Sequence, residues 1–136
     1  MSRFIFLRVL MAGALIAACT STEGPVEPAW GKQPCAHCAM VLSEHGFGAQ
    51  LVSSDGERFF FDDPGCMVLF VEERRLASAR AWVYDDGAGR WTDAHTARYT
   101  RGAGTPMDFG FAATSTGALG WNELRTEVLA KQRGAR

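Results

Sequence analysis

The N-terminal segment decides how much of this chain is left to fold. Residues 1–19 read MSRFIFLRVLMAGALIAAC, with Arg3 and Arg8 in a basic start and an apolar run from Val9 to Ala18. That run is shorter than the ~20 residues that a stable membrane-spanning helix needs. A basic start, a short apolar run and small residues at its end are typical of a cleaved secretory signal. We therefore expect residues 1–18 to be removed and the rest of the 136-residue chain to form one small exported domain.

Cys19 follows the small residues at the end of the signal, and the ending LIAAC resembles the lipobox of bacterial lipoproteins. This resemblance implies cleavage before Cys19 and acylation of that cysteine. Several acyl chains anchor a protein durably, whereas a single chain does not. The alternative is an ordinary signal peptide with a chance cysteine. With the anchor, we expect a lipoprotein that faces the periplasm, at the outer membrane in preference to the inner one.

Acylation of Cys19 changes the arithmetic of the remaining cysteines. The chain contains four cysteines, so three would be left, at positions 35, 38 and 66. An odd number cannot pair completely within one chain, so at least one thiol stays free or all three serve another purpose. The net charge of −1 gives no general attraction to nucleic acid, and we expect no nucleic-acid partner.

The pattern after Cys19 predicts a tether and then a small α+β domain. Residues 19–34 include three prolines and two glycines without an apolar period, and fifteen extended residues reach about 50 Å. From residue 46 onward the periodicity becomes regular. Strands are expected over 47–54, 57–61, 79–86 and 108–115, with another after a turn at 85–91. Helices are expected from 64 to about 76 and over 116–132, and residues 99–107 read as an irregular loop. This order suggests two pseudo-repeated ββα units within a domain of residues 35–133.

The stretch PCAHCAM, residues 34–40, contains the first group of candidate ligands. Cys35 and Cys38 could close a small disulfide, and in an exported protein that is the simplest interpretation. A thioredoxin-like redox motif would need a helix N-terminus in a βαβ unit, and zinc usually needs a second ligand pair. Met40 adds a thioether, and thiolate with thioether sulfur selects Cu(I) over harder ions. His37 is either a borderline ligand or a solvated loop residue.

Two later segments add further sulfur atoms. Asp63 and Pro64 suit the cap and first position of a helix, which places Cys66 at about its third position and Met67 beside it. Met107 lies in a Gly- and Pro-containing loop, away from any periodic apolar face. Each has a structural alternative: a buried small residue for Cys66, the core for Met67 and a loop anchor for Met107. No nucleophile–base pair or phosphate-binding loop stands out, so we expect no catalysis.

Taken in order, these motifs resemble the NosL family. The similarity rests on CAHCAMVL, RFFFDDPGCMVLF and TPM followed by GFAA, and it covers about residues 33–131. The resemblance implies an anchored, periplasm-facing Cu(I) carrier with a duplicated ββα fold. Such a carrier hands copper to the machinery that assembles the copper–sulfide centre of nitrous oxide reductase. The family usually has glycine where this chain has Ala39 and Asp108, and glycine permits φ values that alanine resists.

The resemblance and the residues together give one preferred hypothesis. A lipid-anchored Cu(I) metallochaperone would bind its metal with Cys35, Cys38, Met40 and Met107, and the further candidate donors are His37, Cys66, Met67 and Asp63. Its partners would be the copper-assembly proteins of nitrous oxide reductase, and a homodimer is a further expectation. The alternatives are a structural exported lipoprotein with a Cys35–Cys38 disulfide and an exported thiol–disulfide oxidoreductase.

Overall fold

The structure, a computed structural model, describes residues 24–77 and 79–136. The expected signal segment, Cys19 and the first residues of the expected tether lie outside the described residues. Over the two described ranges, no helix combines the length and the apolar character required to cross a membrane.

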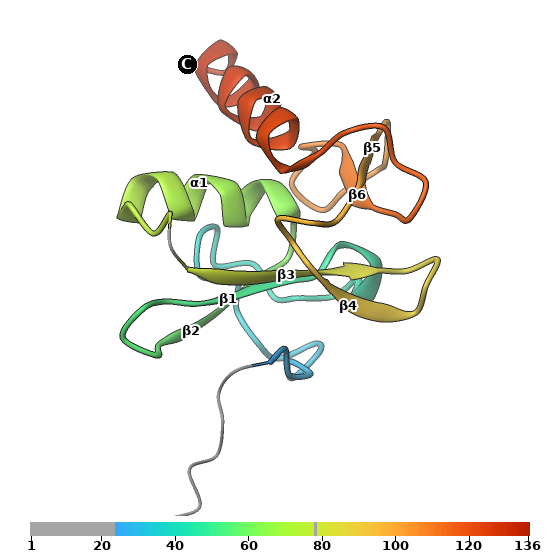
Figure 1. Cartoon of the computed structure of the whole chain (residues 1–136). Helices are drawn as coiled ribbons and strands as arrows, with labels where there is room; N and C mark the ends of the chain where they lie inside the picture. The colour runs from blue at the N-terminus through green and yellow to red at the C-terminus, as the bar shows by residue number, and fades with distance from the viewer. Residues whose placement is uncertain (1–23, 78) are drawn as a thin grey trace, which may run out of the picture.

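Four antiparallel strands form the main sheet, in the order β2-β1-β3-β4 (Figure 1). The strands are β1 (Ala49–Val52), β2 (Arg58–Phe61), β3 (Arg80–Asp85) and β4 (Arg90–Asp93). β1 and β2 form a hairpin whose turn includes Gly56 at φ 90°, a value that favours glycine. The hairpins expected around residues 55–56 and 85–91 are therefore confirmed.

The alternation of side chains along each strand divides the sheet into two faces, of which one carries the apolar core. Ala49 pairs with Phe61 and Val83, and Leu51 pairs with Phe59 and Ala81, so these residues share one face. Helix α1 (Pro64–Arg74) covers that face. Phe70 of the helix lies with its ring centroid 4.8 Å from that of Phe59 and 5.2 Å from that of Phe61.

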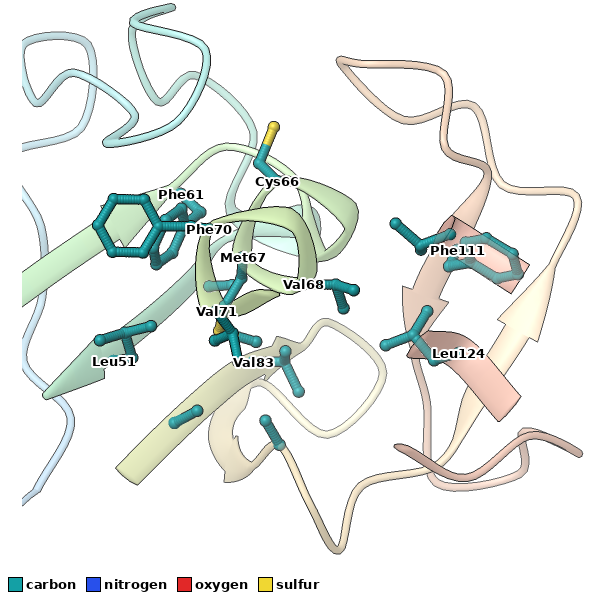
Figure 2. Packing of buried hydrophobic residues seen from close by; sticks show 14 of the residues in the cluster. Leu51, Phe61, Cys66, Met67, Val68, Phe70, Val71, Val83, Phe111 and Leu124 are labelled. Carbon is teal, nitrogen blue, oxygen red and sulfur yellow. The ribbon is translucent and has the colours of Figure 1, made fainter. Parts of the chain in front are cut away.

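Helix α1 begins as the sequence predicts. Asp63 is its N-cap, with the side chain accepting a hydrogen bond from Gly65 N–H at 2.7 Å, and Pro64 occupies the first turn. The first eight residues of the helix, 64–71, are all buried. Figure 2 shows Met67 directed into the core beside Val83, while Cys66 points away from it. Met67 is therefore a core residue, and its side chain does not share the direction of Cys66.

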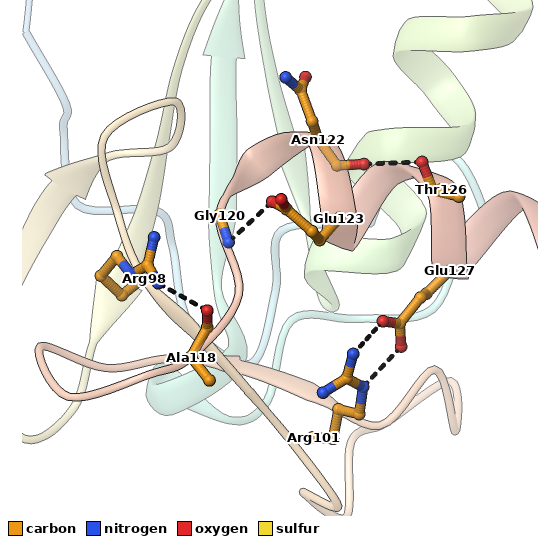
Figure 3. A network of polar contacts seen from close by, with 8 residues as sticks. All are labelled: Arg98, Arg101, Ala118, Gly120, Asn122, Glu123, Thr126 and Glu127. Carbon is orange, nitrogen blue, oxygen red and sulfur yellow. Dashed lines mark hydrogen bonds and ion pairs between the residues drawn. The ribbon is translucent and has the colours of Figure 1, made fainter.

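The second part of the domain is a small ladder with a helix. β5 (Tyr99–Arg101) pairs with β6 (Phe111–Ala113), and α2 (Trp121–Gly134) packs against α1. Figure 3 shows two polar contacts of α2: Arg101 of β5 pairs with Glu127, and at the start of the helix the Glu123 carboxylate accepts Gly120 N–H at 3.1 Å. The interpretation of 99–107 as wholly irregular is wrong at its start, because backbone pairing with β6 makes residues 99–101 a strand.

The α+β class is confirmed, and the order strand–strand–helix occurs twice, as β1-β2-α1 and as β5-β6-α2. The β3-β4 hairpin extends the first sheet, since β3 pairs with β1. A short 3₁₀ helix (His45–Phe47) precedes β1.

The outer face of the sheet carries a segment that the sequence assigned to the tether. Residues 24–33, which we call the strap, lie on the side of the sheet opposite the helices (Figure 1). The Gln50 amide donates to Val26 O at 2.8 Å and accepts from Val26 N–H at 3.0 Å, and Arg58 donates to Gly24 O at 2.8 Å. The tether interpretation is therefore wrong for the strap, because polar side chains of the sheet satisfy its backbone groups.

Candidate metal centre

The C-x-x-C motif lies in a tight loop between Pro34 and Val41, which form an isolated β-bridge. Two backbone hydrogen bonds close the loop: Cys35 N–H donates to Met40 O at 2.7 Å, and Ala39 N–H donates to Cys35 O at 3.0 Å. Ala36 N–H donates to Phe60 O at 2.8 Å, which attaches the loop to the edge strand β2. The motif thus starts no helix, unlike the thioredoxin-type arrangement.

Three thiols converge at this loop. The Sγ atoms of Cys35, Cys38 and Cys66 all lie within 4.8 Å of one another. Three thiolates that bind one ion at about 2.3 Å in a trigonal arrangement lie about 4.0 Å apart, so shifts of less than about 1 Å would complete a three-thiolate site. All three cysteines are free thiols. Cys35 and Cys66 are buried and Cys38 is half-buried, so the cluster opens to solvent at Cys38.

The polar surroundings divide the thiols into two kinds. The Cys66 thiol donates to Cys35, and the backbone N–H groups of Cys38, Asp62 and His37 add to it, which holds the pKa of Cys35 well below its usual range. The pKa of Cys66 is raised, first by that same hydrogen bond and then by burial. Burial is also the largest influence that raises the pKa of Cys38. The cluster is therefore suited to hold one thiolate before a metal ion arrives, and a cation would favour loss of the other protons.

Asp63 holds the neighbouring loop against the start of α1. One carboxylate oxygen caps Gly65, and the other accepts Met107 N–H at 3.3 Å. Phe109 closes the same junction, because a Cβ on Gly65 would lie 2.2 Å from Cγ of its ring. Both carboxylate oxygens of Asp63 thus accept backbone hydrogen bonds. Asp63, three residues before Cys66 in the chain, therefore attaches the loop of Met107 to the start of α1.

The other candidate donors, His37, Met40 and Met107, differ in their contacts and in their exposure to solvent. His37 Nδ1 is 3.5 Å from a carboxylate oxygen of Glu73, which lies two turns along α1 from Cys66. This polar contact helps to attach the loop to the helix. The Met40 side chain is 49 % exposed and that of Met107 is half-buried. Met40 thus lies on the surface, two residues after the half-buried Cys38.

Asp62 brings an unusual carboxyl group to the same place. The residue is 1 % exposed, and its Oδ1 accepts Ser43 N–H at 3.2 Å. Its Oδ2 is a buried atom without a hydrogen-bond partner among the described residues. Burial raises the pKa of Asp62, and the negative charge of Cys35 raises it further. Asp62 therefore retains its proton to a higher pH than an exposed aspartate.

Ala39 and Asp108 both adopt left-handed backbone conformations, with φ of 65° and 56°. They are the two positions at which NosL-like proteins usually carry glycine. A left-handed conformation strains an alanine, whereas aspartate tolerates it better. The turns around the candidate site thus require, at both positions, the φ region that favours glycine.

Sequence reasoning ranked Cys66 below Met40 and Met107, yet Cys66 completes the cluster. The signal that pointed to Cys66 was the odd cysteine count together with its place in the first turn of a capped helix. Comparisons of the chain with models of protein families, with curated proteins and with solved structures give no match. The resemblance to NosL therefore stays a prediction from the motifs.

Proposed function

We propose that this protein binds one Cu(I) ion at the three-thiol cluster and acts as a copper carrier. The observation that supports the proposal is the convergence of the Cys35, Cys38 and Cys66 Sγ atoms to within 4.8 Å. Thiolates are soft ligands and select Cu(I) or zinc over calcium and magnesium. Met40, which is 49 % exposed and follows Cys38 by two residues, carries a thioether that could act as a further soft donor.

The number of ligands favours copper over zinc. Structural zinc sites are almost always four-coordinate. Among the described residues, the cluster consists of three cysteines without a fourth His, Cys, Asp or Glu ligand atom. A three-sulfur site with one half-buried thiol leaves a side from which a partner's ligand could take over the metal. We propose on this basis that the ion is cargo to be transferred.

The destination of the copper follows from the family resemblance alone. We propose that the protein is a NosL-type lipoprotein, anchored through Cys19, that hands Cu(I) to the assembly proteins of nitrous oxide reductase. The protein is then a carrier and not an enzyme. The oxidoreductase alternative fits the geometry less well, since the thiol with the lowered pKa, Cys35, is only 3 % exposed and is poorly placed to attack a partner's disulfide.

The test is a titration of the fully reduced protein with Cu(I) in competition with a chromogenic Cu(I) chelator. We expect one tightly bound ion per chain. Cys35→Ser and Cys66→Ser should each weaken binding by more than the about 10–100-fold that loss of an outer hydrogen-bond partner causes. Met67→Leu is the matched control, because it keeps the core volume next to Cys66 without touching the cluster. No uptake would refute the function, and uptake that survives removal of both Cys35 and Cys38 would refute the site.

A further inference from the structure

The outer face of the main sheet carries aromatic and basic side chains that the copper site does not use. Phe60, Gln50 and Trp82 form one cross-strand row on this face, and Tyr84 and Trp91 form the next. Phe60 and these three aromatic side chains of β3 and β4 are half-buried, whereas the residues of the opposite face in β1 and β3 are buried. Tryptophan and tyrosine combine an apolar body with a polar edge and favour the lipid–water interface.

Basic groups surround these rings. Arg80 is exposed and Arg58 is half-buried, and the Arg58 guanidinium lies 5.8 Å from the centroid of the Trp82 ring. Lys32 of the strap is also exposed. The acidic groups nearby have hydrogen-bond partners: Glu27 accepts from the indole N–H groups of Trp30 and Trp91, and Asp93 accepts from backbone N–H groups. Exposed arginine and lysine close to a membrane surface interact favourably with anionic lipid headgroups.

The strap fixes where the chain leaves this face. Gly24 is held by Arg58 on the outer face, and residues 20–23 alone separate it from Cys19. Five Cα–Cα steps extend at most about 18 Å. A domain of about 110 residues has a radius of gyration of about 13 Å and hence a diameter of about 34 Å. A connection this short cannot reach around the domain.

We propose that the outer face of the sheet, which carries Trp82, Arg58 and Arg80, lies against the phospholipid surface. The inference rests on the proposed acylation of Cys19. The short connection brings this face to the lipid headgroups, and its aromatic and basic side chains match that surface. Helix α1, which carries Cys66, lies on the other side of the sheet (Figure 1). The thiol cluster is then presented to the aqueous compartment, where a soluble or membrane-bound partner can approach Cys38.

The experiment uses the full chain, produced in a host that acylates lipoproteins and checked by intact mass. The protein is inserted into vesicles of phosphatidylethanolamine and phosphatidylglycerol that contain a phospholipid with a photoreactive headgroup. Labelled residues are mapped by peptide mass spectrometry. We expect several-fold more label in residues 24–33, 58–60 and 80–93 than in α2. Equal labelling of α2, or labelling concentrated on residues 34–41, would overturn the proposal.

A spacer variant tests the short connection itself. An insertion of about fifteen Gly and Ser residues between Thr22 and Glu23 adds a root-mean-square length of about 20 Å. The excess of label on the outer face should then fall at least twofold, and an unchanged excess would overturn the role of the connection. A chain without acyl chains would refute this inference but not the copper site, because the Cu(I) titration of the reduced protein does not depend on the membrane.

Discussion

Replacing Ala39 with glycine should stabilise the protein, although Ala-to-Gly changes usually destabilise. Ala39 is held at φ 65° by the loop that brings Cys35 to Cys38. The left-handed region costs an L-residue about 1–2 kcal/mol, which glycine avoids. Glycine loses about 0.4–1 kcal/mol of this gain, because it increases the entropy of the unfolded chain. The net expectation is a stabilisation of about 1 kcal/mol, or about 4–8 °C in the midpoint of thermal unfolding.

The matched control lies in the same loop. Ala36 is likewise exposed but does not have a positive φ. Ala36→Gly should therefore show only the entropic effect and destabilise by about 0.4–1 kcal/mol. Both variants are compared with the parent by urea and thermal unfolding of the reduced, metal-free protein. If Ala39→Gly lowers the stability as much as Ala36→Gly does, the argument that this turn strains an alanine is wrong.

Three further predictions concern the start of α1. Asp63→Ala removes the helix cap and the acceptor of Met107 N–H, so it should cost about 2–3 kcal/mol in urea unfolding, whereas Asp63→Asn, which keeps an acceptor oxygen, should cost less. Gly65→Ala should destabilise the protein by at least about 2 kcal/mol despite the higher helix propensity of alanine, because the new Cβ would lie 2.2 Å from the Phe109 ring. Gly134→Ala is the control and should not destabilise the protein, because nothing lies within 4 Å of its Cβ. The third prediction concerns pH. Burial raises the folded-state pKa of Asp62, so above about pH 4 the folded chain retains a proton that the unfolded chain has lost. The contribution of Asp62 to stability therefore falls as the pH rises above about 4. Asp62→Asn removes that contribution, so its unfolding free energy relative to the parent should grow with pH between acid and neutral conditions, and a difference that is flat in pH would contradict the assignment.

The secondary structure was readable from the sequence where local chemistry decides it. The Asp–Gly turn, the cap at Asp63 and the proline after it depend on a few adjacent residues, and all three are in place. Strand β5 is not predicted, because its three residues have no apolar alternation and their pairing partners, β6 and Leu119, lie ten or more residues further on. The sequence predicts a tether for the strap for a related reason: its prolines break local structure, but Gln50 and Arg58 supply partners from distant strands.

The candidate site divides in the same way. Sequence motifs identified sulfur chemistry at Cys35, Cys38 and Met40, and the odd cysteine count indicated a role beyond one disulfide. Ala39 and Asp108 both have positive φ values, at positions where the family that the chain resembles usually has glycine. Asp63 was considered a further donor, but both of its oxygens accept backbone hydrogen bonds. No local pattern distinguishes a carboxylate that caps a helix and a loop from one that is left to bind a metal.

The sequence by itself determined most of the element types and the soft character of the donors, because each depends on residues within a few positions of one another. Only the tertiary structure decided which sulfur atoms meet. Cys66 and Met67 are adjacent in the chain, yet helical geometry turns one toward the C-x-x-C loop and the other into the core. The attachment of that loop to β2 and to Glu73 then brings residues 35 and 66 together. Long-range packing, and not spacing, selects the three thiols.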